Sequence, residues 1–518
     1  MQWWQRAVVY QVYPRSYADS DGDGVGDLRG LRSRLDHLEW LGVDAVWLSP
    51  TFPSPDDDFG YDVADYRDVH PQLGTLEELD ALIAAAGERG IRILLDLVPN
   101  HTSAQHPWFR GEHRNWYVWA DAAADGRPPN NWKSVFGGSA WSWSEPDGRF
   151  YLHNFLPSMP DLDWWNEDVR REFERILRFW FDRGVAGFRI DVAHGLVHDR
   201  KLRDNPPATP EDTGAYARLG QRLERSINQP EVHEVYRRWR PLADAYDPPR
   251  VLLGETYVME LEKLASFYGN GHDELHLAFN FTFLHADLDA EVMRECVERT
   301  EAALPDGAWP VWTGSNHDVK RFPTRWAGGD PGLARCALLL LLTLRGTPVL
   351  YYGDELLLPQ ADVPAEALRD PVAFRVDREH GRDGARTPMP WSPDPGHGFT
   401  APGTEPWLPF AVRDGFTVAE QRRDAASPLH LARDLIALRR RRDDLVSGAY
   451  ASLPSPPGTW AWRRGEATVA AVNLGDEPAE IATTGAVLVA TDRARDGERV
   501  AASLRLGPGE GAVVDERA

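Results

Sequence analysis

The chain has 518 residues, 42% of them hydrophobic and 26% charged, a composition typical of a folded protein and not of a disordered one. This length exceeds one ordinary domain and suits a large barrel with smaller modules. Because 80 Asp and Glu outnumber 57 Lys and Arg, the formal net charge is −23, and we expect neither nucleic acid nor an anionic membrane as a partner.

The ends and the cysteines favour an intracellular protein. The first residues lead directly into a strand-like run without a signal-peptide pattern, so we expect the chain to begin here and to be cytoplasmic. The two cysteines, Cys296 and Cys336, exclude a structural zinc site made of cysteines and suit a reducing compartment. The longest apolar run, Cys336–Leu344, is much shorter than the ~20 residues that span a bilayer, and we interpret it as a buried helix.

One pattern recurs four times: an amphipathic helix, a glycine that ends it, and a short apolar strand. The expected helices run from Leu28 to Leu41, from the Thr75/Glu78 capping box to Gly90, from the Asn166 cap to Gly184 and from Asp330-Pro331 to Gly346. With four further apolar runs there are eight strand candidates, at Val8–Val12, Val43–Leu48, Ile91–Val98, Val185–Ile190, Val251–Gly254, Leu275–Phe281, Trp309–Thr313 and Pro348–Tyr351.

Strands that alternate with helices predict parallel pairing through right-handed crossovers, and nearly continuous apolar strands predict a sheet covered on both faces. Eight of them favour a (β/α)8 TIM barrel of the α/β class over a doubly wound sheet. A dinucleotide fold gains no support, because no GxGxxG motif follows any strand.

Two segments interrupt the barrel pattern. Asn100–Asp163 is rich in Trp, Pro, Gly and Asn, and residues 195–249 form a second, partly helical excursion. We therefore assign residues 1–100 and 172–445 to the barrel and 101–171 to an insertion domain, domain B. Alternating runs after the last helix assign residues 446–518 to a C-terminal antiparallel β-domain, a β-sandwich.

Charged side chains follow most of the predicted strands, where barrel enzymes carry their chemistry. Asp96, Asp191, Glu255 and Asp318 each lie at or just after a strand end. A lone aspartate is usually a cap or part of an ion pair. Several carboxylates at one barrel mouth are what glycosidic cleavage requires: a nucleophile, a proton donor of raised pKa and a group that stabilises a cationic sugar ring.

Four ordered motifs then resemble those of the α-amylase family. They are Asp96–His101 (DLVPNH), Gly187–Asp191 (GFRID), Gly254–Thr256 (GET) and Ser315–Asp318 (SNHD). A fifth, Met159–Asp163 (MPDLD), is similar to the extra motif of the oligo-1,6-glucosidase and α-glucosidase branch. The resemblance covers about residues 1–445.

The resemblance implies the catalytic roles: Asp191 as nucleophile, Glu255 as acid/base, and Asp318 as the residue that holds sugar hydroxyls and supports the oxocarbenium-like state. Arg189 lies two residues before Asp191 on the same strand face, and its charge is expected to keep the nucleophile ionised. A purely structural Arg189–Asp191 pair is the alternative.

The resemblance also implies a sugar-binding set. His101 and His317 resemble the histidines that bind the nonreducing-end sugar, and Asp62 and Tyr61 its pocket floor and stacking face. Arg386 resembles the arginine that joins Asp62 in gripping the terminal glucose, although Arg382 lies only four residues upstream. A pocket closed by Asp62 and Arg386 would admit one sugar end and imply exo attack on short oligosaccharides.

An acidic ladder near the N-terminus predicts a metal site. It resembles the calcium loop of the same branch, with ligands from Asp19, Asp21, Asp23, Asp27 and the Val25 carbonyl. A full EF-hand is disfavoured, because Gly30 stands where the bidentate glutamate belongs. We expect a structural Ca2+, with Mg2+ and a solvated acidic turn as alternatives.

Together these observations predict a retaining, exo-acting α-glucosidase that releases α-glucose from malto-oligosaccharides, sucrose and, with less support, isomalto-oligosaccharides, with transglucosylation as a side reaction. A glucosyl transferase or isomerase, such as a trehalose synthase or sucrose isomerase, would use the same residues. A non-catalytic sugar-binding or transporter-associated relative is disfavoured, because all three carboxylates are present. Val192 after the nucleophile accompanies α-1,6 activity in the resembled branch, whereas the excursion at 195–249 differs from that branch, and we expect short α-1,4 substrates. We expect a monomer or a weak homodimer.

Overall fold

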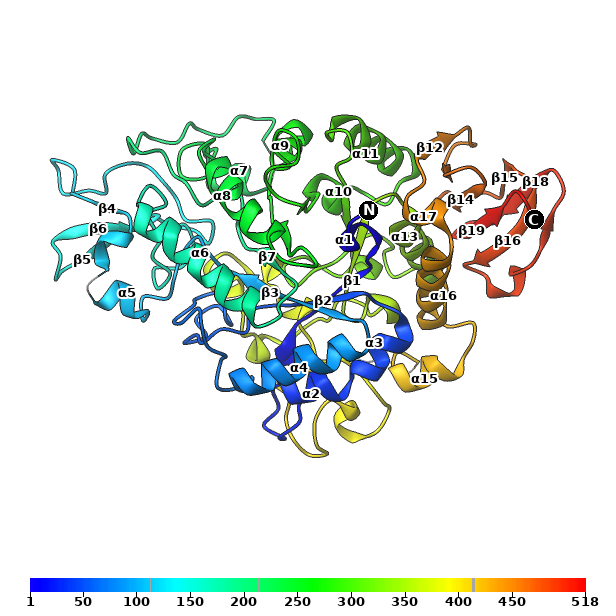
Figure 1. The fold of residues 1–518 in the computed structure, drawn as a ribbon, viewed down its shortest axis with the longest axis horizontal. Helices are drawn as coiled ribbons and strands as arrows, with labels where there is room; N and C mark the ends of the chain where they lie inside the picture. Colours follow the sequence, from blue (N-terminus) through cyan, green and yellow to red (C-terminus); the bar gives the residue numbers. More distant parts are fainter. Residues whose placement is uncertain (112, 213, 412–414) are drawn as a thin grey trace.

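The computed structural model describes residues 1–111, 113–212, 214–411 and 415–518. Eight parallel strands pair in the order β10-β11-β1-β2-β3-β7-β8-β9, and a parallel bridge between Phe279 and Val311 joins the two ends into a barrel (Figure 1). The strands are β1 (Val9–Val12), β2 (Ala45–Leu48), β3 (Arg92–Leu97), β7 (Gly187–Ile190), β8 (Val251–Gly254), β9 (Leu277–Ala278), β10 (Val311–Thr313) and β11 (Thr347–Tyr351). Each overlaps one of the eight predicted strands, which confirms the α/β barrel.

Helices surround this sheet. The longer ones are α4 (Leu76–Glu88), α6 (Glu167–Asp182), α8 (Val232–Asp244), α11 (Ala290–Ala303), α13 (Pro331–Thr343) and α16 (Pro428–Arg441). The shorter ones are α1 (Trp3–Arg6), α2 (Leu28–Ser33), α3 (Leu35–Leu41), α5 (Pro107–Arg110), α7 (Gly214–Leu219), α9 (Leu261–Ser266), α10 (Phe281–His285), α12 (Phe322–Arg325), α14 (Pro371–Arg375), α15 (Val418–Arg423) and α17 (Asp443–Val446). The apolar run Cys336–Leu344 is buried, most of it within α13, as predicted.

Local signals in the sequence set the helix ends. Thr75 and Glu78 form the predicted capping box of α4, and Asn166 and Asp330 cap α6 and α13. The single helix expected from Leu28 to Leu41 is instead two, α2 and α3. Arg34 leaves the helical conformation between them, and its guanidinium donates to the Gly398 carbonyl and lies 4.6 Å from the Trp391 ring.

Two hydrophobic layers hold the barrel together. Inside it, alternate strand residues such as Val9, Trp47, Leu94 and Val251 form one buried cluster. The residues between them on each strand face outwards and join the helices in a larger cluster. The interior is therefore filled with side chains, and the open end left for chemistry is the one where the strands terminate.

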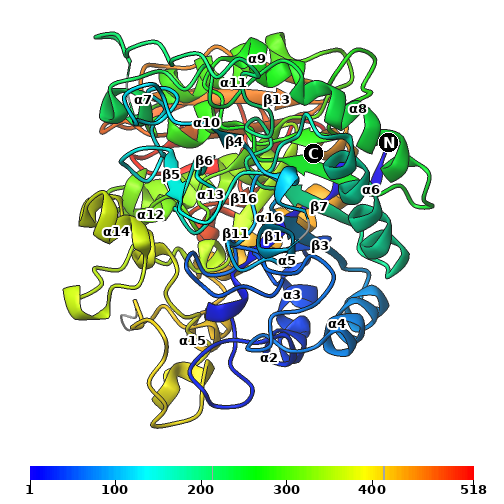
Figure 2. The ribbon, with the colours of Figure 1, turned by 90° about the vertical axis from the view of Figure 1, so that its left-hand side faces the viewer.

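Two smaller β-structures accompany the barrel. Between β3 and α6, the strands β4 (Trp119–Ala120), β5 (Trp141–Ser144) and β6 (Arg149–Leu152) form an antiparallel sheet over its own core. At the C-terminal end, β12 (Tyr450–Leu453), β13 (Thr459–Arg464), β14 (Thr468–Asn473), β16 (Gly485–Ala490), β17 (Arg499–Val500) and β19 (Gly511–Asp515) form a six-stranded sheet. The pair β15 (Ala479–Ala482) and β18 (Ser503–Leu506) shares a hydrophobic core with it. Figure 2 views the molecule from the side of the β4–β6 sheet.

None of the helices in the part of the chain that the structure describes combines the length and the apolar character that crossing a membrane requires.

Candidate active site

The barrel register brings the predicted catalytic side chains together. Asp96 on β3 pairs with Arg189 on β7, and Ile190 pairs with Gly254 on β8. The backbone ladder continues one step further, because the Asp191 amide donates to Leu97 and the Glu255 amide donates to Ile190, each at 2.8 Å. Parallel strands that end at the same level therefore place these carboxylates beside one another.

Close strand packing at this point depends on Gly187. A Cβ atom on Gly187 would lie 2.3 Å from the Val251 carbonyl oxygen of the neighbouring strand. The glycine of the GFRID motif thus lets β7 approach β8, which Glu255 directly follows.

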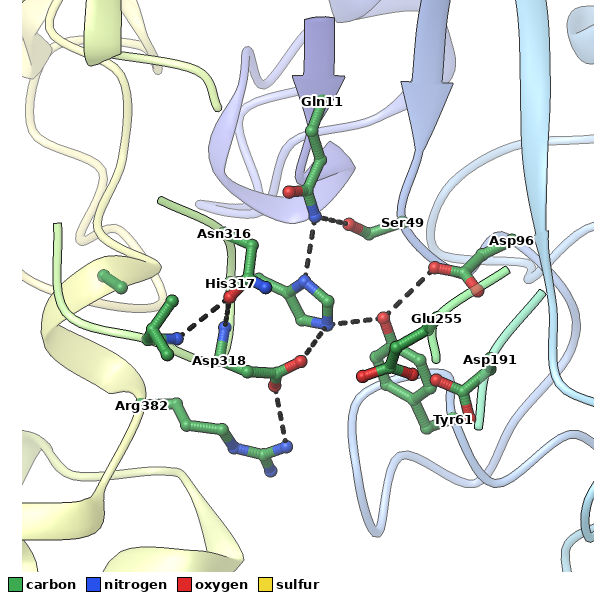
Figure 3. A network of polar contacts seen from close by, with 12 residues as sticks. Gln11, Ser49, Tyr61, Asp96, Asp191, Glu255, Asn316, His317, Asp318 and Arg382 are labelled. Carbon is green, nitrogen blue, oxygen red and sulfur yellow. Dashed lines mark hydrogen bonds and ion pairs between the residues drawn. The ribbon is translucent and has the colours of Figure 1, made fainter. Parts of the chain in front are cut away.

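Arg189 lies at the centre of a buried charge cluster. Its Nη1 is 2.8 Å from Asp96 Oδ1 and 2.6 Å from Asp191 Oδ1, and its Nη2 is 2.7 Å from Glu255 Oε2. Because one guanidinium holds both Asp191 and Glu255, their carboxyl groups are compatible with the ~5 Å separation that retaining glycosidases use. Figure 3 shows Asp96, Asp191 and Glu255 gathered around Tyr61.

Three carboxylates around one guanidinium hold protons more tightly than usual. Burial raises the pKa of Asp191 well above its ordinary value; Arg189 lowers it, but Glu255 and Asp96 raise it, and the net direction is opposite to the one expected from Arg189 alone. Burial likewise raises the pKa of Glu255, and that of Asp96 to about 7. A carboxyl group of raised pKa is what general acid catalysis requires.

The residue after Asp191 orients Glu255. The Val192 amide donates to Glu255 Oε2 at 2.9 Å, and Val192 adopts a φ of 44°, in the left-handed region that β-branched residues avoid. The strained turn aims an amide at the carboxylate, as is common at active sites.

His317 connects Tyr61 to Asp318 (Figure 3). Gln11 Nε2 donates to His317 Nδ1 at 2.8 Å, so the ring proton of His317 is on Nε2. This Nε2–H points towards Tyr61 Oη and towards Asp318 Oδ2, and the distance from Nε2 to Asp318 Oδ2 is 3.0 Å. Burial lowers the pKa of His317 well below its ordinary value, so its ring is neutral. The Tyr61 ring lies nearly parallel to the His317 ring, with the two ring centroids 5.3 Å apart, and the Tyr61 hydroxyl donates to Asp96 Oδ2.

Asp318 remains ionised although it is surrounded by protein. Burial alone would raise its pKa, but His317, Arg382 and Arg386 together lower it below the ordinary value. Both arginines lie 3.2 Å from Asp318 Oδ1. The side chain is still 32% exposed, against 16% for Glu255 and 8% for Asp191. Asp318, Glu255 and Asp191 are thus all accessible to a small molecule, Asp318 most and Asp191 least.

Asp62 and Arg386, which are expected to grip the terminal glucose together, form no ion pair with each other among the residues that the structure describes. The Asp62 carboxylate accepts from Ser54 Oγ at 2.7 Å and from the amides of Asp57 and Asp58, so it stabilises the loop that carries Tyr61. Arg386 is completely buried and donates to the His317 carbonyl at 2.9 Å.

The pair that does form is Asp58 with Arg382. The Arg382 guanidinium contacts Asp58, Asp370 and Asp318 and lies 5.5 Å from the Phe136 ring. Arg382 therefore connects the loop after β2, the segment before α14 and the insertion to the Asp318 carboxylate.

His101 lies at the site, where both nitrogens of its ring contact other residues of the protein. It is 1% exposed, its Nε2 contacts the Tyr61 carbonyl at 3.2 Å, and its Nδ1 faces Asn100 at the same distance. This geometry positions Tyr61, and burial lowers the pKa of His101 to about 3, so its ring is neutral.

The acidic ladder is partly assembled. Oxygen atoms of Asp19, Asp21 and Asp27 lie within 4.8 Å of one another, a hard donor set that fits Ca2+. Asp23 is not among them; its carboxylate accepts from the Val25 amide at 2.8 Å. Burial and the neighbouring carboxylates raise the pKa of Asp21.

Sequence reasoning missed Asp58, Asp370, Gln11 and the role of Asp96, and it preferred Arg386 to Arg382. The run Asp56-Asp57-Asp58 beside Gly60-Tyr61 was a visible signal for Asp58. Gln11 carries none, because a single glutamine on a buried strand is identified only by the histidine that it meets in space.

Comparison with known proteins agrees with this geometry. The alpha-amylase catalytic domain family matches residues 11–448. A probable alpha-glucosidase of Rhizobium meliloti (strain 1021) is 44% identical over 467 residues, covering 86% of this chain and 84% of the relative. An oligo-1,6-glucosidase of Heyndrickxia coagulans is 35% identical over 526 residues, covering 92% of each chain. The crystal structure of an alpha-glucosyl transfer enzyme is similar with a TM-score of 0.91 at 40% identity, covering 99% of this chain and 100% of the other.

Proposed function

Since the chain belongs to the alpha-amylase family and is a glycoside hydrolase, we propose that it is a retaining, exo-acting α-glucosidase that releases α-glucose from the nonreducing end of short α-glucosides. The observation that carries this proposal is the single guanidinium of Arg189 that holds Asp96, Asp191 and Glu255 at one strand edge.

In the proposed mechanism the Asp191 carboxylate attacks the anomeric carbon while Glu255 protonates the departing oxygen. Glu255 then takes a proton from water, and the water hydrolyses the glucosyl ester. The Val192 amide and Arg189 hold Glu255 in place. The ionised Asp318 accepts hydrogen bonds from sugar hydroxyls and stabilises the positive charge of the ring, and Tyr61 stacks against its apolar face.

The exo mode is supported by Arg382. This arginine joins Asp58, Asp370 and Asp318, which come from distant parts of the chain, next to the accessible carboxylates. A charged barrier of this kind would receive the hydroxyl groups of one terminal glucose and would stop a polymer from passing through.

Hydrolysis of a chromogenic α-glucoside tests the proposal. We expect turnover by the wild type, and a loss of at least about 1,000-fold in kcat for Asp191→Asn. Asp36→Asn, which changes an exposed aspartate in the same way, should leave the rate unchanged. Absence of turnover by the wild type on every α-glucoside would return the chain to a sugar-binding role.

Glucosyl transfer or isomerisation is the second candidate, and the similarity to an alpha-glucosyl transfer enzyme favours it. The same covalent intermediate would then be captured by a sugar instead of water. Product analysis with maltose, sucrose, isomaltose and trehalose separates the two. Free glucose as the main product supports hydrolysis, and an isomer or a transfer product without free glucose would overturn it.

The preferred linkage and the metal complete the proposal. We favour short α-1,4 substrates, and the 35%-identical oligo-1,6-glucosidase keeps α-1,6 substrates in the same panel. We also propose that Asp19, Asp21 and Asp27 hold a structural Ca2+, since their oxygens already converge. Bound there, the cation would neutralise the acidic loop before α2, of which Asp27 is the N-cap.

A further inference from the structure

A cavity of about 390 Å³ lies apart from the carboxylate cluster. It forms where three segments meet: β4 at Trp119, the segment Asp163–Asn166 that leads into α6, and the loop His198–Leu202 after β7. In Figure 1, β4 lies towards the left end of the molecule, whereas β3 and β7 lie nearer the middle. No residue of the Arg189 cluster lines this cavity.

His198 is the unusual member of the lining. It is 6% exposed, and within the described ranges neither of its ring nitrogens has a hydrogen-bond partner. Burial lowers the pKa of His198 to about 4, so the ring is neutral and offers one donor and one acceptor. Neither ring nitrogen is among the fully buried side-chain atoms that lack a partner, so both can reach a ligand in the cavity and bond to it.

Two more side chains offer unused hydrogen-bonding capacity. Asp163 Oδ1 accepts from the Trp165 amide at 3.0 Å, and its Oδ2 accepts from none of the described residues. Arg200 is exposed, lies 5.4 Å from the Trp165 ring, and forms no ion pair with any residue that the structure describes. Donors and acceptors of both kinds therefore gather around one tryptophan.

The walls of the cavity are fixed in place. The Asp199 carboxylate accepts from the Arg203 amide at 3.0 Å and from its guanidinium at 2.8 Å, which closes the loop on itself. Trp165 Nε1 donates to the His198 carbonyl at 3.0 Å, so the segment that precedes α6 and the loop are joined. A site built in this way needs little ordering when a ligand binds.

The mixture of groups selects the chemistry of the ligand. The Asp163 carboxylate would repel an anion, the Arg200 guanidinium would repel a cation, and an apolar molecule would offer His198 no hydrogen bond. A neutral polyol satisfies all three, and its C–H faces pack on indole rings. The volume is at the lower end of the ~300–1,000 Å³ of small-molecule sites, which suits a ligand of disaccharide size.

We propose that this cavity is a second carbohydrate-binding site, which holds a neutral oligosaccharide through Asp163, His198, Arg200 and Trp165 and does not take part in the chemical step. That the sugar is a glucose oligosaccharide rests on the proposed function; the existence of a polyol site does not.

Ligand-observed saturation-transfer NMR with maltotriose tests the proposal on the Asp191→Asn protein, in which the ligand is not consumed. Saturating 1-deoxynojirimycin, a glucose-like iminosugar, occupies the catalytic centre. We expect maltotriose to give transfer signals that persist with the iminosugar bound. Arg200→Gln should weaken this remaining binding at least fivefold, and Asp163→Asn should do so as well.

Arg171→Gln is the matched control, since it removes an exposed arginine on α6 that does not line the cavity. It should leave the remaining binding unchanged. In the Asp191-intact protein, Arg200→Gln should also leave kcat/KM for the chromogenic glucoside within about twofold.

Each outcome is decisive. The second site does not exist if the iminosugar abolishes all maltotriose signal. It also does not exist if adding Arg200→Gln or Asp163→Asn leaves the remaining signal as strong as it is in the Asp191→Asn protein alone. Neither result affects the proposed function. If wild-type protein hydrolyses no α-glucoside but Arg200-dependent binding persists, the proposed function fails and the second site stands.

Discussion

Asp58 is ion-paired with Arg382, a residue 324 positions later in the chain. The pair lies next to Asp318, which Arg382 contacts at 3.2 Å. Two loops that leave different strands of the barrel are thereby joined at the carboxylate proposed to hold the sugar. The contact makes Arg382, and not Arg386, the arginine most directly placed for the terminal glucose.

Replacing Arg382 therefore has a specific expected effect. Arg382→Gln should lower kcat/KM for a chromogenic α-glucoside by about 100-fold, because Asp58, Asp370 and Asp318 lose their shared charge partner. Arg378→Gln, an exposed arginine paired with Asp362, should change it less than twofold. Steady-state kinetics of the two variants decide this, and equal effects would remove Arg382 from the site.

Arg189 is the least replaceable cation of the cluster. Arg189→Lys keeps one positive charge but loses the planar fork that contacts three carboxylates at once. We expect kcat to fall by at least about 100-fold. The free energy of unfolding, measured in urea, should fall by about 3 kcal/mol, as for a broken buried ion pair. Near-normal kcat in a stable Arg189→Lys protein would contradict the placement of this residue at the centre.

The pH profile reports the coupling between Asp96 and Glu255. Burial and, to a smaller extent, Glu255 raise the pKa of Asp96, which is about 7 after the lowering by Arg189, so by reciprocity a charged Asp96 raises the pKa of Glu255. Asp96 is charged only above about pH 7, and asparagine imitates its neutral form. Asp96→Asn should therefore move the alkaline limb of kcat/KM to lower pH, and the acid limb as well, because Asp96 also raises the pKa of Asp191.

Asp161→Asn is the control for that experiment. Burial also raises the pKa of Asp161 to about 7, but its hydrogen-bond partner is Asn154, not a member of the cluster. It should leave both limbs unchanged. A shift of the alkaline limb to higher pH in Asp96→Asn would show that the sign of the coupling is wrong.

The barrel was predictable from the sequence because local rules set it. The capping box at Thr75 and Glu78, the Asn166 cap and the short apolar runs each act over a few residues, and all eight strands followed from them. The catalytic carboxylates were found by their place after strands and by motif resemblance. The Asp58–Arg382 pair was not, since nothing local distinguishes Arg382 from Arg386, and only the path of the loops decides which guanidinium reaches the opening.

The break at Arg34 has a similar origin. Residues Leu28–Leu41 carry a continuous helical pattern, yet α2 and α3 separate because Arg34 bonds to Gly398, 364 residues away. Long-range contacts of this kind override a periodicity that is correct on either side of the break.

Calcium is expected to stabilise the fold through the loop before α2. At a concentration 100 times its Kd, Ca2+ should add about 2.7 kcal/mol and raise Tm in a thermal melt, and EDTA should reverse the effect. Asp21→Asn should remove most of this response, whereas Asp23→Asn should keep more of it, because Asp23 is not one of the three aspartates whose oxygens converge. A wild-type Tm that ignores both Ca2+ and EDTA would rule out the site, and a parallel titration with Mg2+ separates the two cations.

The configuration of the first glucose released tests the central claim most directly. Attack by Asp191 followed by attack of water inverts the anomeric carbon twice, so 1H NMR of early hydrolysis should show α-glucose before mutarotation produces the β-anomer. If β-glucose is the first product, displacement occurs once, and Asp191 is not the nucleophile.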